Sequence, residues 1–116
     1  MKRFVVLTGD SEGLGNAVLR HLLRRSEADK CIGISRRPIE QIAGFEELTP
    51  EQRSRYEHLS VDLSDEDAVA EAIESVKRSV DAEEGEIASL VLVNGTGFLD
   101  SDVAIDPSLR ELMEIL

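Results

Sequence analysis

Three glycines near the amino terminus are spaced in a way that could hold a phosphate group. Gly9, Gly13 and Gly15 lie in the stretch LTGDSEGLGN, between the apolar run RFVVL and the segment AVLRHLLRR. The first amides of a helix and the helix dipole attract anions, and glycine lets the backbone come close to them. Between an expected strand and an expected helix, this spacing favours a pyrophosphate-binding loop over a simple turn.

The segment ISRRP, residues 34–38, indicates which nucleotide such a loop would take. In dinucleotide-binding folds an acidic residue about 20 positions past the loop usually holds the ribose 2′-hydroxyl of NAD. Ser35 stands at that place here, and Arg36 and Arg37 follow it. Because a guanidinium can grip a 2′-phosphate through paired hydrogen bonds, we expect NADP(H) in preference to NAD(H). Glu12 in the loop counts against this preference. The alternative interpretation is that Arg36 and Arg37 simply face solvent.

Four apolar runs are the expected strands that must position these residues: 3–8, 30–35, 57–63 and 87–94. Amphipathic helices are expected over 14–25, from a cap at Ser64 onward, and from Asp106 to the end, with a polar connection over 36–55. The second helix would bury a stripe of Val69, Ile73, Val76 and Val80. This alternation predicts an α/β fold with a doubly wound parallel sheet in the strand order 3-2-1-4. The last run, IASLVLVN, is the most apolar, which favours a central position in the sheet.

Three motifs together resemble the short-chain dehydrogenase/reductase family. TGDSEGLG (8–15) resembles its T-G-x-x-x-G-[IL]-G motif, and VDLSD (61–65) resembles the segment whose Asp contacts adenine, here Asp62. LVNGTG (92–97) is similar to the family's N-N-A-G motif, with Gly95 and Thr96 in place of the second Asn and the Ala. The resemblance covers nearly the whole chain and implies a Rossmann-like fold that binds a nicotinamide dinucleotide. The cofactor-binding residues expected from these patterns are Gly9, Ser11, Glu12, Gly13, Leu14, Gly15, Ser35, Arg36, Arg37, Asp62, Leu63, Asn94, Gly95, Thr96 and Gly97.

The family's catalytic set, a Ser and a Tyr-x-x-x-Lys pair, has no counterpart in this chain. Tyr56 is the only tyrosine, and Ser60 stands four residues after it. His21 and His58 share no metal-ligand spacing with each other or with Cys31, so we expect structural histidines. We therefore expect no catalytic residue and no metal site here, and whether the chain is an enzyme stays open.

The segment LRELMEIL (109–116) resembles the run that precedes the family's catalytic Asn. It predicts a single, incomplete domain over residues 1–116, truncated after the fourth strand and the start of the following helix, with that strand at an unprotected edge. The first hypothesis is thus the cofactor half of a short-chain oxidoreductase acting on a carbonyl or alcohol. The alternatives are a non-catalytic dinucleotide-binding or interaction module, complete as written, and an S-adenosylmethionine site.

Composition limits the partners. The net charge is −11, which argues against nucleic-acid binding, and no apolar segment is long enough for a membrane span. The single cysteine, Cys31, precludes an internal disulfide and lies in an apolar run typical of a buried thiol. We expect a cytoplasmic protein, compatible with a homo-oligomer whose contacts the sequence does not identify.

Overall fold

A four-stranded parallel sheet organises the chain. The structure is a computed structural model, and it describes residues 1–93. The strands β1 (Lys2–Thr8), β2 (Lys30–Ser35), β3 (Tyr56–Ser60) and β4 (Gly85–Val91) pair in the order β3-β2-β1-β4, and every pairing is parallel. The predicted α/β class and strand order are confirmed.

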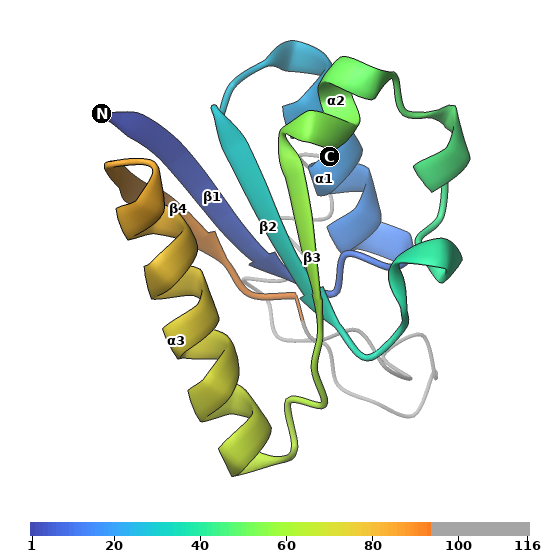
Figure 1. The fold of residues 1–116 in the computed structure, drawn as a ribbon. Coiled ribbons are helices and arrows are strands. Elements are labelled where there is room, and N and C mark those ends of the chain that lie inside the picture. Colours follow the sequence, from blue (N-terminus) through green and yellow to red (C-terminus); the bar gives the residue numbers. More distant parts are fainter. Residues whose placement is uncertain (94–116) are drawn as a thin grey trace, which may run out of the picture.

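Helices cover both faces of this sheet (Figure 1). On one face lies α3 (Glu66–Ala82), over a core that includes Phe4, Ile32 and Val76. On the other face lie α1 (Gly13–Arg25) and α2 (Pro50–Ser54), with two short 3₁₀ turns, η1 (Ile39–Gln41) and η2 (Phe45–Glu47). Since successive residues of a strand point to opposite faces, β1 supplies both cores, with Phe4 on the α3 side and Leu7 on the α1 side.

The start of α3 differs from the sequence prediction. Its cap is Asp65, whose carboxylate accepts hydrogen bonds from the backbone amides of Asp67 and Ala68, at 3.0 and 3.2 Å. The prediction of Ser64 as the cap is wrong, because the Ser64 hydroxyl donates to the carboxylate of Asp62 instead, at 2.7 Å. The buried stripe also differs: Ala72, Val76 and Val80 are buried, whereas Ile73 is half exposed.

The outer strands and the long connection show the remaining differences. β3 ends at Ser60, three residues earlier than predicted, and the connection over 36–55 contains η1, η2 and α2. Within residues 1–93, β4 pairs with β1 alone, so in this part of the chain it lies at the outside of the sheet, as the edge prediction placed it, and not at the central position that its apolar sequence favoured. Ile87 and Leu90 are accordingly at least half exposed. The helix expected from Asp106 lies outside the described residues.

Candidate cofactor site

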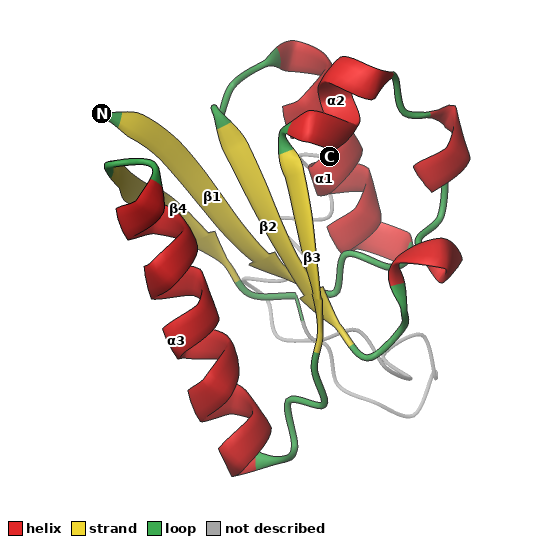
Figure 2. Ribbon diagram, in the orientation of Figure 1, coloured by secondary structure: helices red, strands yellow, loops and turns green. Residues whose placement is uncertain are grey.

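The predicted site residues that the structure describes gather where the strands end, at the carboxyl-terminal side of the sheet. The glycine-rich loop joins β1 to α1, Ser35 ends β2, and Asp62 and Leu63 follow β3. Because all strands are parallel, their carboxyl ends lie at the same edge (Figure 2). In open α/β sheets this edge is where ligands bind. Asn94, Gly95, Thr96 and Gly97 lie outside the described residues.

The three glycines of the loop have different physical roles. Gly9 has a φ of +72°, and a Cβ there would lie 2.8 Å from the carbonyl oxygen of Val93. A Cβ on Gly15 would collide with the carbonyl group of Gly9. Gly13 has a φ of +68°, and a Cβ there would meet no atom of residues 1–93 within 4 Å. Gly9 and Gly15 are therefore required for close packing, whereas Gly13 borders open space that a ligand can enter.

The start of α1 provides backbone donors for an anion. Glu12 precedes the helix in an extended conformation, its side chain makes no capping hydrogen bond, and the first turn contains no acidic residue. Among the described residues, no side chain therefore caps these first amides. Together with the open space at Gly13, this arrangement fits a pyrophosphate group.

Buried polar contacts hold the loop in place. The side-chain amide of Asn16 donates to the carbonyl oxygens of Asp10 and Ala43, both at 2.9 Å. The backbone amide of Gly9 donates to Ile34 at 2.8 Å, and the amide of Ala43 donates to the carbonyl of Ser11 at 2.8 Å. The loop is thus attached to β2 and to the segment between η1 and η2 before any ligand arrives.

The arginines expected to bind a 2′-phosphate follow β2, and one of them has an acidic partner. Arg37 lies 3.2 Å from Glu12, and both side chains are about half exposed or more. Arg36 is exposed, and its charge contributes to lowering the pKa of Asp62. Ser35 is buried, and its hydroxyl has no hydrogen-bond partner within residues 1–93. One of the two arginines expected at the 2′-phosphate is thus already paired with the acidic residue of the loop.

Asp62 is held in an orientation suited to accepting hydrogen bonds. Its Oδ1 atom accepts from the backbone amide of Ser64 at 2.9 Å and from the Ser64 hydroxyl at 2.7 Å. These two bonds hold the pKa of Asp62 below its ordinary value, so the carboxylate is ionised near neutral pH. Both Asp62 and the following Leu63 are exposed at the edge of the sheet.

A buried polar group that includes one residue of the loop was missed by the sequence reasoning. The carboxylate of Asp10 accepts hydrogen bonds from the Tyr56 hydroxyl and from Nδ1 of His58, and we call these three residues the Asp10 cluster. Gly33 makes room for it, since a Cβ there would collide with the Asp10 carboxylate. The sequence did contain a signal for this cluster. Tyr56 and His58 stand at alternate positions of one strand, and the neighbouring strand has a glycine at its centre.

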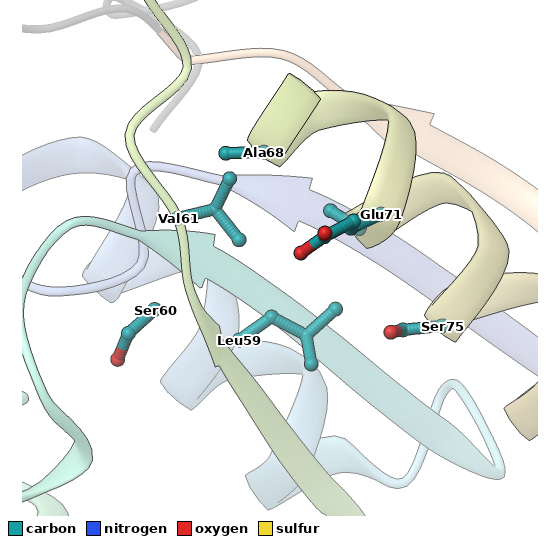
Figure 3. A pocket seen from close by; sticks show the side chains of 7 residues that line it. Leu59, Ser60, Val61, Ala68, Glu71 and Ser75 are labelled. Atoms are coloured by element: carbon teal, nitrogen blue, oxygen red, sulfur yellow. The ribbon is translucent and has the colours of Figure 1, made fainter. Parts of the chain in front are cut away.

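The cavity between β3 and α3 is separate from this site. It has a volume of about 200 Å³ and is lined by Leu59, Ser60, Val61, Ala68, Glu71, Ala72 and Ser75 (Figure 3). Leu59 packs against the core on the α3 side of the sheet, whereas α1 and its loop lie on the opposite side. We therefore do not assign the cavity to cofactor binding.

Two other kinds of site find no support in the described part of the chain. Residues 1–93 contain no group of three or more His, Cys, Asp or Glu side chains that could hold a metal ion. In the same range, no helix combines the length and the apolar character that a membrane crossing needs.

Comparison with known proteins agrees with the fold described above. A model of the KR domain family matches residues 4–102. A search of curated proteins found no match. The carbonyl reductase Sniffer of Caenorhabditis elegans superposes with a TM-score of 0.66 over 94% of this chain and 44% of its own, at 15% sequence identity.

Two further solved structures agree with this fold. A ketoreductase from the first module of phoslactomycin biosynthesis in a Streptomyces species has a TM-score of 0.60 and 25% identity, and covers 82% of this chain and 22% of its own. A short-chain dehydrogenase/reductase from Burkholderia vietnamiensis has a TM-score of 0.59 and 23% identity, with coverage of 94% and 49%. The chain thus spans less than half the length of each of these proteins.

Proposed function

This chain belongs to the KR domain family of short-chain dehydrogenases/reductases, and we propose that it is the NADP(H)-binding portion of an oxidoreductase. The observation that carries the proposal is the juxtaposition at one sheet edge of an open glycine loop, the uncapped amides of α1 and two arginines. In this proposal, the bound nicotinamide transfers hydride to a carbonyl or accepts it from an alcohol. The pyrophosphate lies on the start of α1, the adenine lies by Asp62, and Arg36 and Arg37 face the 2′-phosphate.

A second candidate is a dinucleotide-binding module without catalysis, and it is favoured by the state of Tyr56. This tyrosine is 7% exposed, and burial together with its bond to Asp10 raises its pKa far above the ordinary value. It is therefore unsuited to donate a proton to a substrate near neutral pH. The coding sequence beyond Leu116 discriminates the two candidates: a Ser followed some 13 residues later by Tyr-x-x-x-Lys supports the enzyme, whereas a stop codon supports the module.

The cofactor assignment is tested by isothermal titration calorimetry with NADPH, NADH and S-adenosylmethionine in parallel. We expect saturable binding of NADPH, weaker binding of NADH and no binding of S-adenosylmethionine. A folded chain, as judged by circular dichroism, that does not bind NADPH would overturn the proposal.

Replacing Arg36 by aspartate should weaken NADPH binding about 30-fold or more while changing NADH affinity much less. A guanidinium attracts the 2′-phosphate that only NADPH carries, and a carboxylate repels it. The matched control is Arg78→Asp, which makes the same charge change near the C-terminal end of α3, where Arg78 donates a hydrogen bond to Ser75. Equal losses for the two cofactors would show that Arg36 does not read the 2′-phosphate.

Replacing Glu12 by glutamine should strengthen NADPH binding by about two- to fivefold, the range of an exposed ion pair. The change removes a negative charge beside the expected phosphates and frees Arg37, which lies 3.2 Å from Glu12. Glu74→Gln serves as the control, because Glu74 forms a comparable exposed pair with Lys77 on α3. Calorimetry at low and high salt measures the effect, and weaker binding by the Glu12 variant would contradict it.

A further inference from the structure

The Asp10 cluster joins the glycine-rich loop, which contains Asp10, to Tyr56 and His58 of β3. The Asp10 side chain is 0% exposed and the His58 side chain 1% exposed, and Oδ2 of Asp10 lies 2.7 Å from Nδ1 of His58. The same oxygen accepts the Tyr56 hydroxyl, whereas Oδ1 of Asp10 has no hydrogen-bond partner within residues 1–93. A buried carboxylate with so few donors depends strongly on each of them.

His58 connects two segments through its two ring nitrogens. Its Nε2 lies 2.6 Å from the backbone carbonyl oxygen of Arg37, which can only accept, so Nε2 carries a proton. Its Nδ1 faces the Asp10 carboxylate, and that contact suits a second proton on the ring. Burial lowers the pKa of His58, but its hydrogen bonds to Asp10 and Arg37 and the charge of Asp10 outweigh burial and raise it.

We propose that His58 is a positioning residue for the dinucleotide, whose imidazolium ties the glycine-rich loop, through Asp10, to the turn after β2, through Arg37. This inference rests on the proposed function, because the loop is the expected pyrophosphate site and the turn the expected 2′-phosphate site. When the ring is neutral and keeps its bond to Arg37, its lone pair faces the Asp10 carboxylate. The hydroxyl of Ser60 still donates a hydrogen bond to the Arg37 carbonyl, at 3.0 Å. The contact that is lost when His58 is neutral is therefore its hydrogen bond to Asp10 in the loop.

Two titratable groups beside the cluster, Tyr56 and Cys31, keep their protons near neutral pH. Tyr56 on β3 stays protonated, because burial and Asp10 raise its pKa far above the ordinary value. On β2, burial raises the pKa of Cys31 to about 11, although the charge of Arg55 opposes this. Arg37 and Glu12 lie on the solvent side, where they pair with each other. A pH dependence in this range therefore reports on His58.

The expected sign follows from linkage. Cofactor affinity is highest while His58 is protonated and falls as the pH rises through its folded-state pKa. By reciprocity, bound NADPH must raise the pKa of His58. Nuclear magnetic resonance of the histidine ring protons, with and without NADPH, measures this shift on the unmodified chain, and the exposed His21 on α1 is the internal reference.

The matched variants are His58→Gln and His21→Gln. NADPH affinity is measured between about pH 6 and about pH 9. Over this range we expect the affinities of the unmodified chain and of His21→Gln to fall, and each fall should be about tenfold larger than the fall for His58→Gln. Comparison between variants at each pH is required, because the 2′-phosphate itself titrates near pH 6, and does so equally in all three. At the lowest pH, His58→Gln should bind NADPH about tenfold more weakly than the unmodified chain.

The outcomes separate this inference from the proposed function. Failure of the unmodified chain to bind NADPH at any pH would overturn the proposed function itself. NADPH binding with the same pH dependence in His58→Gln as in His21→Gln, or with no change in the pKa of His58, would overturn the positioning role alone. If His58→Gln does not fold, the pKa shift in the unmodified chain decides the question.

Discussion

Replacing Gly33 by alanine is expected to destabilise the chain by about 3 kcal/mol or more, the loss typical of breaking a buried ion pair. Gly33 pairs with His58 in the register of β2 and β3, and the Asp10 carboxylate lies over it. A methyl group at Gly33 would have to displace that carboxylate from Tyr56 and His58. Because the carboxylate is buried, the clash cannot be relieved by rotating an exposed side chain. Urea unfolding followed by circular dichroism measures the free energy of unfolding.

The control for this substitution is Gly13→Ala. Gly13 has a positive φ, so alanine costs about 1 kcal/mol there, but its methyl group meets no atom of the described residues within 4 Å. A double-mutant cycle with Asp10→Ser isolates the cause, because removing the carboxylate should make Gly33→Ala much less costly. Equal stability losses for Gly33→Ala and Gly13→Ala would refute the role assigned to Gly33.

Replacing Gly15 by alanine is expected to reduce NADPH affinity by about 100-fold or more, equivalent to about 2.7 kcal/mol. A Cβ at Gly15 would collide with the backbone of Gly9 and approach the carbonyl oxygen of Thr8 at 3.0 Å. Because both neighbours are backbone, α1 must move away from β1, and its first amides then leave the expected pyrophosphate position. The variant should also lose about 1–3 kcal/mol of stability, the usual range for overpacking.

Calorimetry with NADPH, at a temperature where circular dichroism shows the Gly15 variant folded, measures this loss. Leu22→Ala is a useful comparison, because Leu22 lies on α1 at the margin of the core, away from the loop. It should lower stability while leaving NADPH affinity within about twofold, since its packing does not touch the loop. A folded Gly15→Ala that binds NADPH like the unmodified chain would contradict the prediction.

The fold class, strand order and glycine loop could be predicted from local patterns. Apolar runs such as RFVVL have the composition of buried parallel strands, and right-handed crossovers leave few topologies for alternating strands and helices. The loop glycines were identifiable because their spacing reflects a local need, the close approach of backbone to backbone or to phosphate. Residues 94–97, where the sequence also predicts cofactor contacts, lie outside the described structure and stay a prediction.

Local patterns were less reliable at element ends and on helix faces. Ser64 and Asp65 both have side chains that cap helices, and the choice depends on Asp62, which accepts the Ser64 hydroxyl. Ile73 fits the helical period of the stripe but lies half exposed, because the rotation of α3 against the sheet places Ala72 in the core instead.

The Asp10 cluster and the pairing of Glu12 with Arg37 required the tertiary structure. Asp10 and His58 are 48 positions apart, and they meet only because the parallel register sets Gly33 beside His58 and leaves a space for the carboxylate. Glu12 and Arg37 meet because the carboxyl ends of β1 and β2 share one edge. Residue types and spacing along the chain specify elements and a phosphate loop, whereas contacts between side chains on different elements depend on register and packing, which no local pattern encodes.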